Sequence, residues 1–196
     1  IISMSLGGKG NPDDPLSNAI DNVVDFGIVT VIAAGNSGPG YNTIGSPGTA
    51  RKAITVAASD KSDVIAEFSS RGPTDIGTIK PDITAPGVAI RSTLPGNTYN
   101  SYSGTSMAAP HVSGVSALLL QKYPGLSPEQ VKAIIVNNGI SLSLDSFTQG
   151  SGRIDALKAI NAPLLISPTS LGFVINTNTN SSSNNFKVKL EELIPN

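Results

Sequence analysis

The chain has 196 residues and a formal net charge of −1, so it is long enough for one domain and the beginning of a second. No stretch concentrates lysine and arginine and no apolar run reaches the ~18 residues of a membrane span, which argues against nucleic acid and membranes as partners. The sequence contains no cysteine, which excludes a disulfide framework and a thiol nucleophile.

The first third of the chain predicts a strand, a helix and a second strand. Residues 1–6 form an apolar run typical of a buried parallel strand. A helix is expected next, with Asp13 or Asp14 as N-cap and an apolar stripe along residues 16–24. Residues 28–34 are apolar and β-branched, which predicts another buried strand. This order implies a right-handed crossover within a parallel sheet.

The middle of the chain adds further short strands and two longer helices. Strands are expected over residues 53–58, 83–87 and 90–94. A long helix should follow Ser106 and be buried on most of its faces, because its residues are apolar almost all round. The next helices are expected at 127–139, where Ser127 and Gln130 form a capping box, and at 153–160.

The C-terminal residues have a different character. Residues 164–166, 172–175 and 186–190 read as strands, and the last of them alternates apolar and lysine side chains. We therefore expect residues 163–196 to begin an appended β-sandwich domain that is incomplete here. A chain that opens directly on a strand is also expected to be a fragment.

Ser106 follows a glycine and a threonine at the predicted start of the long helix. A serine in this place is either an N-cap, whose hydroxyl accepts a hydrogen bond from the first turn, or a nucleophile in the positive field of the helix N-terminus. Residues 104–112, with the sequence GTSMAAPHV, resemble the nucleophile motif of the subtilisin-like serine proteases, or subtilases. The resemblance implies that Ser106 is the catalytic nucleophile.

Asn36 stands in a Gly-Asn turn directly after a predicted buried strand. On its own such an asparagine stabilises its loop. Residues 33–39, with the sequence AAGNSGP, resemble the oxyanion-hole segment of subtilases, and they precede the serine motif in the order expected for that family. The resemblance implies that Asn36, together with the backbone N–H of Ser106, stabilises the oxyanion that forms during acyl transfer.

The same resemblance implies a substrate-binding surface. Residues 5–7 are similar to an edge segment that pairs with the substrate backbone, residues 33–35 to one wall of the specificity pocket, and residues 44–48 to its base. Another interpretation is that these glycines only permit tight turns. No charged residue is expected in the pocket. The substrate-binding residues implied in this way are Ser5, Leu6, Gly7, Ala33, Ala34, Gly35, Gly45 and Thr105.

The catalytic base is not evident in this sequence. His111 is the only histidine, and five residues along a helix place it some 140° around the axis from Ser106, so it cannot be the base. By resemblance it is a structural histidine of the motif. The four aspartates between the two motifs are expected to be turn or surface residues, and they are Asp60, Asp63, Asp75 and Asp82. The triad Asp and His would precede Ile1.

The sequence thus predicts an α/β fold with a mostly parallel sheet flanked by helices, in which residues 1–162 are the C-terminal part of a subtilisin-like peptidase domain. The resemblance implies a secreted or cell-surface serine endopeptidase that acts on protein or peptide substrates. It also implies a possible propeptide and further β domains. No cofactor is needed for the chemistry, although a structural calcium is possible by family analogy. The alternatives are a pseudoprotease acting as a binding module, a peptide ligase or cyclase, and an α/β-hydrolase esterase.

Overall fold

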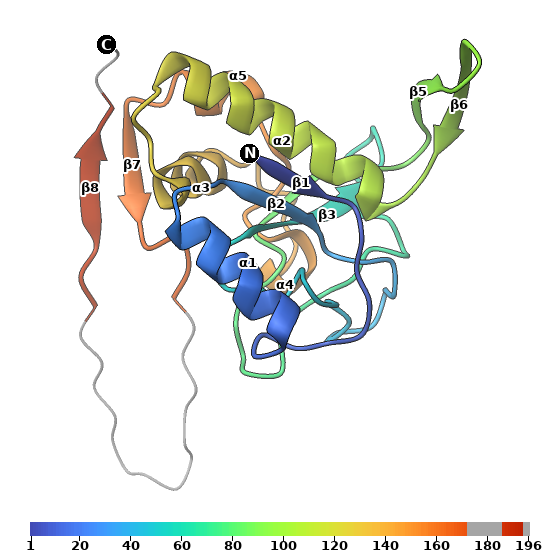
Figure 1. The fold of residues 1–196 in the computed structure, drawn as a ribbon, viewed down its shortest axis with the longest axis horizontal. Helices are drawn as coiled ribbons and strands as arrows, with labels where there is room; N and C mark the ends of the chain where they lie inside the picture. The colour runs from blue at the N-terminus through green and yellow to red at the C-terminus, as the bar shows by residue number, and fades with distance from the viewer. Residues whose placement is uncertain (172–185, 194–196) are drawn as a thin grey trace, which may run out of the picture.

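A four-stranded parallel sheet forms the centre of the computed structural model, which describes residues 1–171 and 186–193. Its strands are β1 (Ile2–Met4), β2 (Thr30–Ala33), β3 (Ile54–Ser59) and β4 (Ile83–Pro86), in the order β1-β2-β3-β4 (Figure 1). Every adjacent pair is parallel. The predicted α/β class and the positions of these strands are confirmed.

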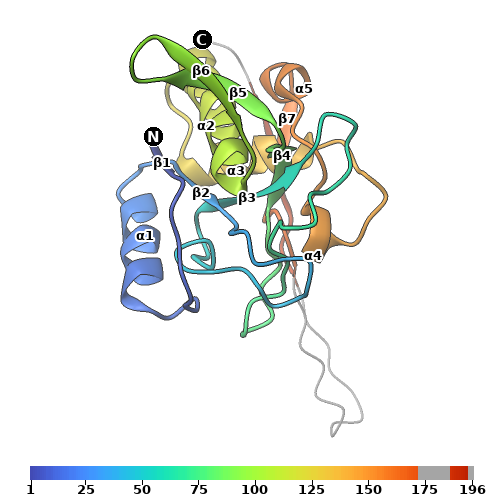
Figure 2. The same cartoon turned by 90° about the vertical axis from the view of Figure 1, so that its right-hand side faces the viewer.

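Helices cover both faces of this sheet, as Figure 2 shows for α1 (Pro15–Asp25) and α2 (Thr105–Lys122). The alternation along β2 explains the arrangement, because successive side chains of a strand point to opposite faces. Val31 belongs to the core cluster that contains the buried side of α2, whereas Ile32 belongs to the cluster of α1. Strand β2 is therefore buried on both faces, as a central parallel strand should be.

The remaining helices are α3 (Pro128–Asn137), α4 (Ser146–Gln149) and α5 (Ala156–Ile160). The predicted capping box of α3 is present, with Ser127 accepting from the Gln130 N–H and Gln130 accepting from the Ser127 N–H. Asp14 is the N-cap of α1, which decides between the two aspartates. Helix α4 was not predicted, because its four residues are too few to show an apolar period.

Strand β1 differs from the sequence prediction in its burial. Its residues are exposed or half-buried, with Ile2 36% exposed, because within the described sheet it lies at the edge and pairs only with β2. The apolar run predicts the strand correctly but its burial wrongly, because the run carries no information about which strand lies at the edge.

A hairpin of β5 (Ile90–Leu94) and β6 (Thr98–Tyr102) projects from the body of the molecule just before α2 (Figure 1). Strand β5 was predicted. Strand β6 was missed because its residues are nearly all polar and exposed, so they show no alternation. The turn uses positive φ angles at Gly96 (82°) and Asn97 (56°), residue types that adopt the left-handed region most readily.

At the C-terminal end, β7 (Leu164–Ser167) pairs antiparallel with β8 (Lys189–Glu192). Leu165 on β7 is fully buried in the same core cluster as α2 and α3, so this strand packs on the main body. The predicted strand at 172–175 lies outside the described residues. The appended β-sandwich therefore stays a prediction.

Asp82 is not a turn or surface residue, contrary to the sequence prediction. Its carboxylate lies 2.7 Å from Lys80 Nζ and 2.8 Å from Lys132 Nζ, and it accepts the backbone N–H of Thr55. Burial would raise the pKa of Asp82, but the ammonium groups of Lys132 and Lys80 hold it below its ordinary value. Burial in turn lowers the pKa of Lys80 to about 8.

Replacing Asp82 tests this buried network. Asp82→Asn should lower the free energy of unfolding by about 3–5 kcal/mol, because two buried lysines lose their counter-charge. The native pKa of Asp82 lies below the ordinary 3.8, so the unfolded chain takes up its proton first as pH falls. The free energy of unfolding of the wild-type protein should therefore decrease as the pH is lowered below about 4. The variant should not show the part of this decrease that comes from Asp82. Urea unfolding across pH measures both effects.

Asp25→Asn is the matched control, because the Asp25–Lys52 pair is solvent-exposed. Its loss should change the free energy of unfolding by less than about 1 kcal/mol. Equal effects of the two substitutions would contradict the role assigned to the buried network.

Candidate functional site

Ser106 is the second residue of α2, not its N-cap. The N-cap is Gly104, which has no side chain to accept a hydrogen bond, so the capping interpretation of Ser106 is wrong. The Ser106 hydroxyl instead points back to β1 and lies 3.4 Å from the Ser5 carbonyl oxygen, while Ser5 Oγ donates to the Ser106 carbonyl at 2.8 Å. The half-buried serine is thus held between the end of β1 and the positive end of an 18-residue helix.

Asn36 lies at the carboxyl end of β2 and is oriented by Thr105. Its side-chain oxygen accepts both the backbone N–H of Thr105 at 2.9 Å and the Thr105 hydroxyl at 3.0 Å. The same hydroxyl accepts the Gly35 N–H at 3.2 Å. Because Asn36 Oδ1 already accepts two hydrogen bonds, the NH₂ group of the amide remains as a donor. None of the described residues accepts a hydrogen bond from this NH₂ group.

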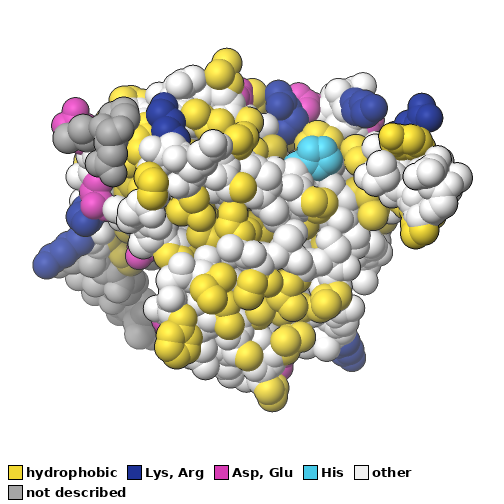
Figure 3. Space-filling view, turned by 45° about the horizontal axis from the view of Figure 1, so that its top comes forward, with side chains coloured by type: hydrophobic (Ala, Val, Ile, Leu, Met, Phe, Trp, Pro, Cys, Tyr) yellow, Lys and Arg dark blue, Asp and Glu magenta, His cyan; other side chains and the backbone are white. Residues whose placement is uncertain are grey.

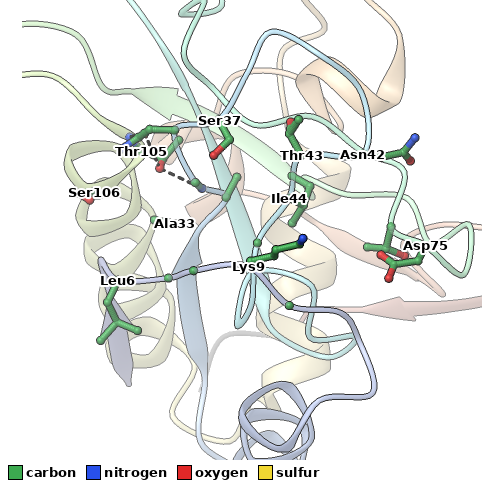
Figure 4. Close-up of a pocket in the computed structure, with 18 of the residues that line it drawn as sticks. Leu6, Lys9, Ala33, Ser37, Asn42, Thr43, Ile44, Asp75, Thr105 and Ser106 are labelled. Atoms are coloured by element: carbon green, nitrogen blue, oxygen red, sulfur yellow. Dashed lines mark hydrogen bonds between the residues drawn. The ribbon is translucent and has the colours of Figure 1, made fainter.

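A cleft of about 1090 Å³ runs from the start of α2 between the loops that follow β1 and β2 (Figure 4). The loops reach the same edge of the sheet because carboxyl ends of parallel strands lie together. All ten residues that the sequence singled out line this cleft, and they are Ser5, Leu6, Gly7, Ala33, Ala34, Gly35, Asn36, Gly45, Thr105 and Ser106.

The base of this cleft depends on close backbone packing. Gly8 donates its N–H to the Ser46 carbonyl at 2.9 Å, which brings the loop after β1 against residues 44–48. A methyl group at Gly45 would overlap the carbonyl oxygen of Gly8. The close approach of these backbones agrees with the turn interpretation and shapes the cleft, and the pocket interpretation stays a prediction.

The cleft is also lined by two charged residues that the sequence did not assign to it. Lys9 comes from the loop after β1, and the exposed Asp75 comes from the turn after residue 73. The expectation of an uncharged pocket concerned residues 33–35 and 44–48, which carry no charged side chain, and it stays a prediction. Lys9 could have been found, because it stands two residues after the segment already assigned to substrate binding. Asp75 carries no such signal, because a long-range contact brings it there.

His111 does not face a reacting group. Its Nδ1 lies 2.9 Å from the carbonyl oxygen of Met107, one turn earlier on α2, and its side chain is exposed. The face drawn in Figure 3 shows this single histidine of the sequence at the surface among scattered apolar side chains. The geometry agrees with the expectation that His111 is not the base for Ser106.

Within residues 1–171 and 186–193, no group of three or more acidic, histidine or cysteine side chains is placed to hold a metal ion. No helix of the same residues is long and apolar enough to cross a membrane. What the cleft does present is a serine at a helix start beside a free amide donor, on an α/β scaffold. A serine hydroxyl and amide donors in this arrangement are the kinds of group that acyl transfer by a serine hydrolase uses as nucleophile and oxyanion donors.

Comparison with known proteins places the chain in a family. The sequence model of the subtilase family matches residues 1–181, and the chain belongs to this family of serine peptidases. Serine protease AprX of Bacillus subtilis is 44% identical over 188 residues, which cover 83% of this chain and 41% of AprX. Subtilisin DY of Bacillus licheniformis is 45% identical over 79% of this chain and 54% of its own length. Family membership removes the α/β-hydrolase esterase hypothesis.

Solved structures show the same fold. Sphericase superposes with a TM-score of 0.69 and 34% identity, covering 78% of this chain and 56% of its own. The self-cleaved protease domain of PatA has a TM-score of 0.69 and 29% identity over 81% of this chain and 60% of its own. The chain thus spans about half the length of these relatives.

A methyl group at Gly45 tests the close packing at the base of the cleft. Gly45→Ala should lower the free energy of unfolding by about 1–3 kcal/mol, because the overlap with the Gly8 carbonyl forces the two loops apart. Gly8→Ala is the matched control, since a methyl there meets no atom within 4 Å. Urea unfolding of both variants measures the difference, and an undisturbed Gly45→Ala would show that the loops do not pack in this way.

Proposed function

We propose that this chain forms the nucleophile and substrate-binding part of a subtilisin-like serine endopeptidase, with Ser106 as nucleophile and Asn36 in the oxyanion hole. The observation that carries the proposal is the pair of hydrogen bonds from Thr105 to Asn36 Oδ1. They fix the side chain so that its NH₂ group, and not its oxygen, is available beside Ser106. An amide with the opposite orientation would repel an oxyanion.

In the proposed reaction, Ser106 Oγ attacks the carbonyl carbon of the scissile peptide bond. The negative charge that develops on the carbonyl oxygen is stabilised by the Asn36 NH₂ and by the backbone N–H of Ser106 at the helix start. The leaving amine departs with a proton, the acyl group stays on Ser106, and water then hydrolyses the ester.

The proton transfers need a base that these 196 residues do not supply. His111 is directed to the Met107 carbonyl, and it is the only histidine of the sequence. We propose that a histidine and an aspartate from residues outside this sequence complete the triad, and that the chain alone is inactive. A pseudoprotease would lack these residues in the intact protein, so the flanking gene sequence separates the two possibilities.

Substrate binding is proposed to use the walls of the cleft. Residues 5–7 would pair with the substrate backbone as an added strand, since they follow β1 directly and line the cleft. Residues 33–35 and Gly45 would enclose the side chain before the scissile bond.

The remaining family-based proposals concern the intact protein. We propose a secreted or cell-surface location, protein or peptide substrates, a propeptide and further β domains. A structural calcium also stays a family-based proposal, and its ligands would include backbone carbonyl and amide oxygens, since the described acidic side chains form no cluster of three.

Purified 196-residue protein should show little or no turnover of a peptide substrate. The physical reason is that no described side chain is placed to act as a base and remove the proton of the Ser106 hydroxyl, which lies near the Ser5 carbonyl. Hydrolysis of an internally quenched peptide measures this. Robust turnover that Ser106→Ala abolishes would contradict the proposal of a missing base.

In the complete protein, Asn36→Ala should lower kcat by about 10²–10³-fold with little change in KM, a magnitude taken over from the oxyanion-hole asparagine of this family. The loss falls on kcat because the amide binds charge that exists only in the transition state. Steady-state kinetics measure the split, and an unchanged kcat would reject the oxyanion role. Product analysis with an added amine acceptor would reveal a ligase or cyclase, which transfers the acyl group to the amine.

A further inference from the structure

Lys9 is a cation without a partner inside the cleft. Of the described residues that line the cleft, it is the one lysine or arginine, and no ion pair or hydrogen bond of its side chain is found among the described residues. Figure 4 shows its side chain reaching into the cleft beneath Ile44, on the route from Ser106 toward the far end. The ammonium group is therefore available to a ligand.

The backbone on both sides of Lys9 is anchored. Before it, the Gly8 N–H donates to the Ser46 carbonyl at 2.9 Å. After it, the Asn11 N–H donates to Asp14 Oδ2 at 3.0 Å, and Asp14 is the N-cap of α1. These anchors fix the point from which the side chain extends, so less conformational freedom is lost when it binds a ligand.

Lys9 also adjoins the proposed pocket base. Gly8, its neighbour in sequence, is in direct contact with Gly45. A substrate side chain that passes the wall formed by residues 33–35 and reaches Gly45 therefore approaches Lys9. Apart from Lys9 and Asp75, the residues that line the cleft are uncharged.

We propose that Lys9 is a specificity determinant that selects peptides with a carboxylate side chain in the pocket beside Ser106. The inference rests on the proposed function and adds the substrate class. A glutamate or aspartate side chain would form a charge-assisted hydrogen bond with the ammonium group. A lysine or arginine side chain would meet like-charge repulsion in the same place.

Asp75 is the competing charge, and its position makes it secondary. Both side chains are exposed, and Figure 4 draws Asp75 beyond Lys9 as seen from Ser106. Lys9 directly follows Gly8, which contacts Gly45, whereas Asp75 belongs to the turn after residue 73. A substrate side chain that reaches Gly45 is therefore expected to meet Lys9 first.

Peptide binding to the 196-residue chain tests the inference without requiring catalysis. The probes are acetylated tetrapeptide amides that differ only in their last residue, Glu, Gln or Lys. Affinity is measured by NMR titration of ¹⁵N-labelled protein, and the backbone signals of Asn36, Gly45 and Ser106 report whether the peptide occupies the cleft. The Glu peptide should bind on the order of fivefold more tightly than the Gln peptide. The preference should shrink in about 1 M salt, where the screening length is ~3 Å.

Three variants identify the group responsible. Lys9→Met keeps the length of the side chain and should equalise the Glu and Gln peptides. Lys9→Glu should reverse the order, so that the Lys peptide binds more tightly than the Glu peptide. Lys61→Met is the matched control, because Lys61 is exposed and outside the cleft, and it should keep the preference for Glu.

The outcomes separate this inference from the proposed function. Equal affinity of wild-type protein for the Glu and Gln peptides, with shifts at Asn36 and Ser106, would overturn the role of Lys9 and leave the proposed function standing. Tightest binding of the Lys peptide, lost in Asp75→Asn, would also overturn it and assign selectivity to Asp75. Binding of no peptide would overturn both the inference and the proposed substrate cleft.

Discussion

The contact between Thr105 and Asn36 is the interaction on which the site depends. It joins the carboxyl end of β2 to the amino end of α2, two elements about 70 residues apart in the chain. One acceptor oxygen takes two donors, and this double contact sets both the distance between the elements and the direction of the amide. Because the Thr105 hydroxyl also accepts the Gly35 N–H, the loop before Asn36 is fixed by the same residue.

Small side chains allow this contact to form. Ala108 and Ala109 are fully buried on the side of α2 that faces the sheet, so the helix can lie close to the strands. A methyl group at Gly87 would collide with Ala58 and approach Ala108, which shows how little space remains between β3 and the start of the helix. Larger residues at these positions would lift the helix and separate Thr105 from Asn36. The packing of the core therefore controls the geometry of the proposed oxyanion donors.

The sequence predicted what local patterns and motifs encode. Apolar runs located β2, β3 and β4, and capping residues located the starts of α1 and α3. Four short segments that resemble the subtilase family selected ten residues that the fold brings into one cleft. The roles of these residues still rest on the family resemblance, since geometry shows where they lie and not what they do.

The failures share a physical cause, which is that long-range contacts leave little trace in local sequence. Asp82 looks like a turn residue beside Pro81, and only the approach of Lys132 from α3 shows that its charge is compensated in the core. Asp75 reaches the cleft through tertiary packing in the same way. The exposure of β1 depends on which strand lies at the edge, and no pattern within β1 determines that.

The geometry of α2 also explains why the nucleophile and the base cannot lie on the same helix here. Residues on the same face of a helix as Ser106 are three, four or seven positions from it in sequence. His111 is five positions away and therefore lies on another face of the helix. Its Nδ1 accordingly meets the carbonyl of its own helix. In the proposed mechanism the base would therefore come from another element, whereas Ser106, Asn36 and the cleft walls are held by β1, β2 and α2. The proposed substrate binding depends on contacts among these elements and the proposed proton transfer on groups elsewhere, so peptide binding can be measured in this chain without turnover.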